Sequence, residues 1–455
     1  MRGGGGIFYN REQGNAQYGI INVAPNSYAV TFDAGNYPSG TLNYNTIGRL
    51  DPLAAAGGTD LSTMSINDLD WPRMYQVSAG ISRRIPWHHT IEASYVGTFG
   101  RHMAAQHQIN SVPIGTFSSG RVGNADLSNP LHRAALTANV VNARRPFPTL
   151  QNVNIFEPIG TSNYNGLQLT LSRQTGRFTY LAAYTYSKFK GTIGGDFAQI
   201  DPLDPARSYG TLLGDRTHNL AFSWTARLGD PVLNNAIGKA FLNGWNLSGI
   251  SSYVSGQPIR LGFTGDLSTD SAEQAWFGSK DFLPYSRDFS QGGTGAITPT
   301  FTCDPTVKGG GNNVGDKVLD LSCVGIPALG QSGPFASPYN LRAPSRNFHD
   351  LTVFKDFRFG QSDRRIQIRA GVFNLFNQAY PIAPAGPGGT DIDLTLEANC
   401  NRRVNGVPNG EGGFADNVCD PTGGYTFTSN TVQNFGKIIT KRGRRVVEFA
   451  LRLFF

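Results

Sequence analysis

Apolar and polar residues alternate with a period of two through much of the chain. The C-terminal stretch shows the pattern most clearly, because every second residue back from the end is apolar. These residues are Phe455, Leu453, Leu451, Phe449 and Val447. The positions between them are mixed and carry both charges. A period of two predicts a strand with one apolar face and one more polar face.

Nine further segments are strand-like, and most are enriched in β-branched and aromatic residues, whereas the first is rich in glycine. They cover residues 2–9, 75–82, 91–95, 167–172, 178–186, 219–228, 245–253, 351–359 and 365–376. Together with the C-terminal stretch they give ten expected strands.

Short and long connections alternate between these segments. The short ones are residues 84–89, 174–177 and 360–363, and residues 229–243 are intermediate where a short turn is expected. The long ones, rich in Gly, Pro, Asn and Ser, are residues 100–162, 190–216, 257–346 and 378–433. A soluble sandwich gives no reason for this alternation. A barrel of the bacterial outer membrane does, because its periplasmic turns are short and its external loops are long.

Strand direction then places the last segments. If the final strand ends at the periplasmic rim, residues 435–440 belong to an external hairpin and do not cross the membrane. The four external loops are large for a ten-stranded barrel. The sequence therefore predicts an all-β fold, an antiparallel transmembrane β-barrel with long external loops. We expect residues 1–455 to be its C-terminal part of about ten strands, with the plug domain and the N-terminal strands absent.

Composition agrees with this fold and disfavours several functions. The 455 residues include Gly 56 and Pro 26, and no apolar run approaches the roughly 18 residues of a transmembrane helix. The net charge is +7 and the pI is about 9.2, but the basic residues are scattered, so we expect no nucleic-acid partner. The sequence lacks nucleophile-elbow, P-loop, zinc and EF-hand motifs. We expect no enzyme activity, no cofactor and no bound metal.

Several motifs resemble the barrel of TonB-dependent outer-membrane receptors, specifically the Oar-like branch. They are residues 163–168 (NYNGLQ), 184–188 (YTYSK), 215–219 (DRTHN), 244–249 (GWNLSG), 255–258 (SGQP), 347–357 (NFHDLTVFKDF) and 373–381 (FNLFNQAYP). The resemblance implies a barrel of about 22 strands around a plugged lumen, energised by the TonB complex. This chain has about half of those strands, and we identify no plug, so TonB would act only through the missing plug region.

The resemblance also implies two further partners, outer-membrane lipid and the barrel-assembly machinery. That machinery recognises a terminal strand ending in an aromatic residue. We expect its signal here to be Phe449, Leu451, Leu453 and Phe455.

Charged residues on the polar side of the strands are candidates for a lumen-facing site. They are Arg227, Arg365, Arg369, Glu448 and Arg452. In a large barrel they would line a substrate path or pair with the plug. The alternative is ordinary wall packing and ion pairing without a specific ligand.

The four cysteines fall into two loops. Cys303 and Cys323 share one, and Cys400 and Cys419 share the next. Outside the cytoplasm such pairs are oxidised, so we expect a disulfide within each loop. We expect each bond to shape a loop that has no hydrophobic core. The alternative is four unpaired loop cysteines.

Two functions remain open. One is a receptor barrel that takes up an unidentified solute captured by the external loops. The other is an outer-membrane surface binding or adhesion protein without transport.

Overall fold

The computed structural model describes the strands of the wall and most of the chain beyond them. The described residues are 1–9, 59–64, 70–110, 112–113, 115–148, 150–192, 209–229, 238, 242–276, 297–309, 311, 313–334, 337–358, 364–382 and 391–455.

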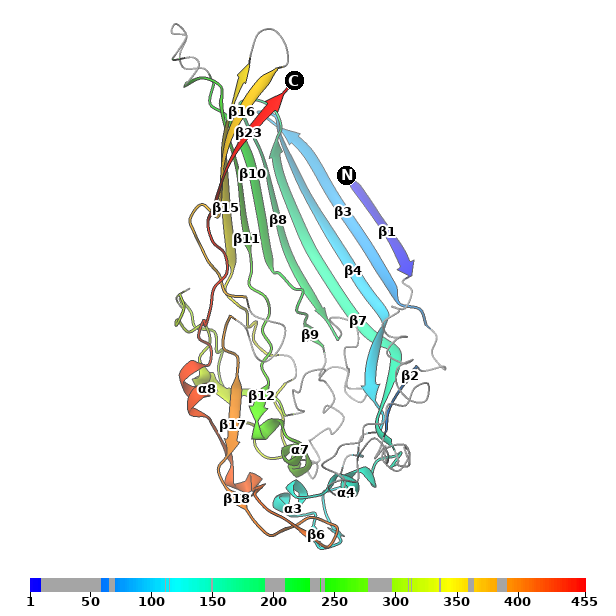
Figure 1. The fold of residues 1–455 in the computed structure, drawn as a ribbon. Coiled ribbons are helices and arrows are strands. Elements are labelled where there is room, and N and C mark those ends of the chain that lie inside the picture. The colour runs from blue at the N-terminus through cyan, green and yellow to red at the C-terminus, as the bar shows by residue number, and fades with distance from the viewer. Residues whose placement is uncertain are drawn as a thin grey trace, which may run out of the picture.

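Ten long antiparallel strands form one curved sheet (Figure 1). In order across the sheet they are β1 (Arg2–Tyr9), β3 (Arg73–Ile85), β4 (His89–Gln108), β7 (Leu150–Arg173), β8 (Phe178–Gly191), β10 (His218–Arg227), β11 (Trp245–Val254), β15 (Arg346–Arg358), β16 (Arg365–Phe373) and β23 (Val446–Phe454). The ten expected strands are confirmed. β1 and β23 are the two edges, and pairing between them is not observed in the described residues. Two short strands, β2 (Thr59–Met64) and β9 (Gly210–Thr211), pair with β7 and β8.

The register gives the sheet one apolar and one polar face. Directly opposed residues of neighbouring strands share a face. One row across β11, β15, β16 and β23 consists of Leu247, Val353, Ala370 and Phe449. A row on the other face consists of Thr225, Ser248, Thr352, Gly371 and Glu448. The apolar face stays exposed to its surroundings, with Phe449 81% and Leu451 65% accessible. It is therefore the face that meets lipid.

Short turns and long connections lie at opposite ends of the sheet (Figure 1). The turns after β3 and β7 take only a few residues, whereas the connections at the other end carry many small elements. These are β5 (Arg121–Val122), β6 (Ala125–Asp126), α3 (Pro130–Ala134), α4 (Ala138–Asn142), β12 (Phe263–Gly265), η3 (Asp266–Ser268), α7 (Asp270–Trp276), β13 (Thr300–Phe301), η5 (Leu321–Cys323), β14 (Val324–Gly325), β17 (Leu396–Cys400), β18 (Arg403–Val404), β19 (Val407–Pro408), β20 (Phe414–Ala415), β21 (Val418–Cys419), η6 (Pro421–Gly423), β22 (Tyr425–Phe427) and α8 (Ser429–Asn434). We call this part the cap.

The cap has its own hydrophobic core, which corrects the expectation that no core supports the loops. Fully or almost fully buried members come from three separate connections. They include Phe117, Leu127, Phe263, Trp276, Leu319, Leu394, Phe435 and Ile438. Each connection contributes apolar residues that are mostly scattered in its sequence, although Ile392, Leu394, Leu396 and Ala398 alternate with a period of two. The core therefore exists only when the three connections pack together.

Two sequence predictions about the connections can be compared with the structure: the position of residues 435–440 and the bounds of the loop at 100–162. β16 pairs directly with β23, and Phe435 and Ile438 are buried in the cap core, so the external placement of residues 435–440 is confirmed. The expected bounds of the loop at 100–162 were wrong, because β4 continues to Gln108 and β7 starts at Leu150. Pairing there is interrupted by register shifts around Met103, and Ala105 and Phe156 are buried in protein. These ends of β4 and β7 are covered by protein and not by lipid, so their residues need not alternate between apolar and polar. The strands therefore continue where the period of two in the sequence has stopped.

Some connections fall outside the described residues. The expected short turn at 360–363 does so, as do most of residues 229–243. None of the helices that the structure describes is both long and apolar enough to cross a membrane.

Candidate functional site

The five charged candidates share the polar face of the sheet. Arg365 and Arg369 lie on β16, and Glu448 and Arg452 lie on the adjacent β23. The pairs Gln367–Arg452 and Gly371–Glu448 place these four on the same face. Arg227 lies at the end of β10 opposite Asn246, on that face, but β11 and β15 separate it from β16.

The guanidinium and carboxylate groups of this set do not neutralise one another. The Arg365 guanidinium stacks on the Phe454 ring, with 4.2 Å from Cζ to the ring centroid. Within the described chain, none of the five candidates forms an ion pair. The β16–β23 part of the wall therefore presents net positive charge. A wall of this kind attracts anionic groups over several ångströms.

A shallow depression of about 390 Å³ lies on the wall across β8, β10 and β11. Its lining includes six residues from alternate positions of the polar face, which are Thr179, Leu181, Ser223, Thr225, Ser248 and Ile250. Leu181 and Ile250 flank Ser223 in one row and are 45% and 55% exposed. Sequence reasoning missed this feature. Its signal was an apolar residue on the polar side of β8 and of β11, the two strands on either side of β10.

The DRTHN motif forms the joint between wall and cap. The Asp215 carboxylate is 2% exposed and accepts hydrogen bonds from the Phe189 N–H (2.5 Å), the Thr217 hydroxyl (3.3 Å) and the Arg342 guanidinium. Arg342 also donates to the Gly256 carbonyl at 3.1 Å. Gly256 cannot carry a side chain, because a Cβ there would collide with the Ala343 carbonyl oxygen. The joint thus ties the β8–β10 and β11–β15 connections to each other and to strand β8 of the wall.

Arg133 joins two connections inside the cap. The residue is only 6% exposed. Its guanidinium donates to the Ala275 carbonyl from Nε (3.0 Å) and Nη2 (2.7 Å). Its Nη1 donates to the Leu127 carbonyl at 2.7 Å. Burial lowers the pKa of this guanidinium. Since α7 ends at Trp276, these bonds satisfy a carbonyl in its last turn, which has no intrahelical partner.

Both expected disulfides are present in the cap. Cys303–Cys323 has a Cα–Cα distance of 4.9 Å, and Cys400–Cys419 has one of 5.8 Å. Each joins cysteines of a single connection.

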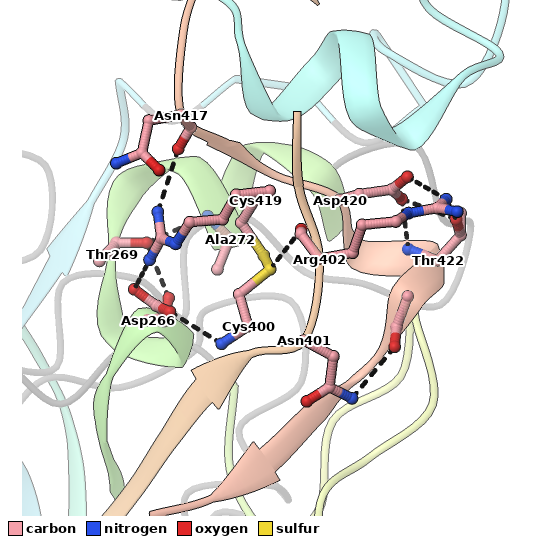
Figure 2. The surroundings of a disulfide bond; sticks show 12 residues. Asp266, Thr269, Ala272, Cys400, Asn401, Arg402, Asn417, Cys419, Asp420 and Thr422 are labelled. Carbon is pink, nitrogen blue, oxygen red and sulfur yellow. Dashed lines mark hydrogen bonds and ion pairs between the residues drawn. A yellow bond between two sulfur atoms is a disulfide. The ribbon is translucent and has the colours of Figure 1, made fainter. Parts of the chain in front are cut away.

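Figure 2 shows how the second disulfide is held. Asp266, from a different connection, accepts hydrogen bonds from the Cys400 N–H at 2.8 Å and the Arg403 guanidinium at 2.6 Å. Asp420 pairs with Arg402 beside it. Burial alone would raise the pKa of Asp420, but the Thr422 hydroxyl, Arg402 and the Thr422 N–H together lower it.

The expected assembly signal lies on the apolar face of the edge strand β23. Phe449, Leu451, Leu453 and Phe455 are 81%, 65%, 52% and 98% exposed. The first three oppose Ala370, Ile368 and Ile366 of β16. Their recognition by assembly machinery stays a prediction. Across the described residues, no three His, Cys, Asp or Glu side chains are arranged to hold a metal ion.

Two solved bacterial transporters resemble parts of this chain. The outer membrane transporter YddB from Escherichia coli is 10% identical with a TM-score of 0.36, over 72% of this chain and 32% of that one. The FrpB iron transporter from Neisseria meningitidis is 10% identical with a TM-score of 0.34, over 89% and 34%. The chain thus spans about a third of the length of these proteins.

The chain's family is identified from its own sequence. No curated protein matches it significantly. A family model does match, over residues 1–444, and its description is an outer membrane beta barrel domain. The predicted outer-membrane barrel is therefore confirmed in its family and its location. On this evidence the chain belongs to the outer membrane beta-barrel domain family and is a protein of the bacterial outer membrane.

Proposed function

We propose that this chain is the wall and external cap of an outer-membrane receptor that takes up an unidentified solute. The observation that carries the proposal is the folded cap at one end of a wall whose inner face is polar and carries uncompensated arginines. The cap core, the Asp215–Arg342 joint and the two disulfides hold the connections in one arrangement. A preorganised surface binds with a smaller loss of conformational entropy than four independent loops would.

The wall continues from this cap toward the periplasm. The depression beside Leu181 and the positive β16–β23 segment lie on the face that would line a lumen. An anionic solute with an apolar part matches both features. No catalytic step is part of the proposal. We further propose that additional strands pair with β1 and β23, because an unpaired sheet edge is not tolerated in lipid. A TonB complex would act through a plug region outside residues 1–455.

Uptake can be tested without knowing the solute. Cells with and without the protein are grown in the same complex medium, and depletion of small molecules from the medium is compared by mass spectrometry. We expect one or a few compounds to be depleted only by cells with the protein, and an uncoupler of the proton gradient to stop the depletion. Identical depletion profiles contradict the proposal.

The second candidate function, surface binding without transport, is favoured by the same cap. It predicts a different result in that experiment. A compound would associate with cells that carry the protein and would be released intact by washing, with or without the uncoupler.

A further inference from the structure

The outer face of the wall has an aromatic group at its short-turn end. The rings of Phe178 and Tyr180 are 5.6 Å apart, and Tyr180 lies 5.8 Å from His89 and 6.0 Å from Phe222. The Tyr180 hydroxyl also contacts His89 Nδ1 at 2.9 Å. Bands of aromatic residues mark the headgroup level of membrane barrels. The headgroup region of the periplasmic leaflet therefore lies at this height.

Arg173 emerges from the middle of this aromatic group. In the register it lies between His89 of β4 and Tyr180 of β8. Its Nε is buried and has no hydrogen-bond partner among the described atoms. Its Nη2 lies 3.2 Å from the position that a Cβ would take on Gly176, in the turn after β7. The register thus places Arg173 between two residues of the aromatic group, and its guanidinium lies near the turn at the rim, as those of arginines at membrane interfaces do.

A second arginine faces the same side. Arg83 of β3 opposes Ile91 of β4, which is on the apolar face, and it is exposed. In the part of the chain that the structure describes, neither Arg83 nor Arg173 forms an ion pair with a carboxylate.

The opposite end of the same outer face differs. There Arg73 pairs with Asp70 at 2.8 Å, and His102 lies 3.1 Å from the same carboxylate. Arg73 and His102 thus have a carboxylate partner within the protein, whereas Arg173 and Arg83 have none among the described residues. At the headgroup level, lipid phosphate is available as the anionic partner of the two arginines.

We infer that Arg173, with Arg83 on the same face beyond the intervening strand β4, binds the phosphate of an anionic phospholipid of the periplasmic leaflet. The guanidinium presents paired N–H donors to phosphate oxygens. The aromatic group contacts the glycerol and the upper acyl chains. Basic clusters at the membrane surface select anionic lipids in this way.

The test measures which lipid sits against the wall. The protein, purified from outer membranes, is reconstituted in phosphatidylcholine with spin-labelled phosphatidylglycerol or spin-labelled phosphatidylcholine, and the immobilised fraction of each label is compared. We expect a preference for phosphatidylglycerol that falls roughly five-fold in Arg173→Gln and is largely retained in Arg173→Lys. Arg83→Gln, which alters no contact within the wall, should lower the preference without disturbing the fold.

Arg84→Gln is the matched control. Arg84 is the next residue along β3, is equally exposed, and faces the polar side. Its variant should keep the full preference. Equal immobilisation of both labels by the unaltered protein overturns the inference, as does an equal loss in Arg84→Gln and Arg173→Gln. Inorganic phosphate is added as a competitor, and displacement of the labelled lipid by it at low concentration would assign the site to free phosphate and overturn the lipid assignment.

Discussion

Asp215 and Arg342 form a buried ion pair although 127 positions separate them in the chain. Their side chains are 2% and 13% exposed. The pair joins the start of β10 to the segment that precedes β15, at the level where the wall ends and the cap begins.

Removing one charge of this pair should loosen the cap. Asp215→Ala leaves the Arg342 guanidinium and the Phe189 N–H without their acceptor, which destabilises by about 3–5 kcal/mol when a buried pair is broken. We expect faster proteolysis of the cap in intact cells, with heat-modifiable migration of the wall preserved. Asp70→Ala is the control, because the exposed Asp70–Arg73 pair contributes at most about 1 kcal/mol. Equal protease sensitivity of both variants would refute a special role for the joint.

Non-reducing peptide mapping should recover Cys303–Cys323 and Cys400–Cys419 from protein isolated out of the outer membrane. Free thiols at all four positions, or pairing between the two connections, would contradict the structure. Cys400→Ser combined with Cys419→Ser should lower the stability of the cap by about 3 kcal/mol, since each bond closes a ring of about twenty residues. The loss would appear as protease cleavage near residues 401–418 before cleavage elsewhere.

Truncation of Phe454 and Phe455 should block assembly more than it weakens the finished wall. Phe455 lies beyond the last paired residue and is 98% exposed, and Phe454 contributes only the last pairing of the strand and the contact with the Arg365 guanidinium, so the truncation removes little of the described packing. We expect the truncated protein to accumulate in the periplasm without heat-modifiable migration. Arg452→Gln, on the polar face of the same strand, should assemble as usual. Normal insertion of the truncated chain would show that the assembly signal lies elsewhere.

The cap core should unfold independently of the wall. Phe435→Ala removes a ring that is 0% exposed, a change that destabilises by about 3–5 kcal/mol. Phe414→Ala, in the same connection but 67% exposed, is the matched control and should have little effect. Hydrogen exchange of cap peptides should rise in Phe435→Ala only, while peptides of β7 and β8 stay protected. Increased exchange in the wall strands as well would mean that wall and cap unfold together.

Acid should destabilise the cap. Hydrogen bonds from the Ser128 hydroxyl lower the pKa of Asp126, and the Ser322 N–H lowers that of Asp320. The pKa of Asp420 is also lowered. A carboxyl whose folded pKa lies below its unfolded value, about 3.9, stabilises above that pH and stops doing so as the pH falls through the folded pKa. The urea midpoint of the cap should be flat near neutral pH and fall below about pH 4. A midpoint that rises in acid would contradict these pKa directions.

The sequence predicted the wall far better than the cap, for a physical reason. Lipid on one side and polar surroundings on the other impose a period of two on every spanning strand. Phe449 on the apolar face and its neighbour Glu448 on the polar face follow this period. The cap follows no such rule. Phe117, Trp276 and Phe435 lie in three different connections, and nothing in their local sequence shows that they share a core.

The candidate site shows the same division. The disulfides could be predicted because each pair is separated by 20 or 19 positions inside one connection. The DRTHN motif could be recognised in the sequence, but the role of Asp215 could not. That role depends on an ion pair with Arg342, which is too far along the chain for the sequence to indicate the contact. The depression beside Leu181 and Ile250 needed the cross-strand register, which a single sequence does not specify.

The shared core of the cap also limits how this surface can evolve. Antibodies, phages and competing bacteria select for change in the parts of an outer-membrane protein that they touch. Here a substitution at Leu394 or Trp276 would disturb connections that lie far apart in the chain, so it would be tolerated only with compensating changes. Exposed positions such as Phe414 and Val314 are not part of this core, so they can change without compensating substitutions. Substitutions should therefore accumulate on the exposed surface of the cap, while the residues of its core change slowly and keep its shape.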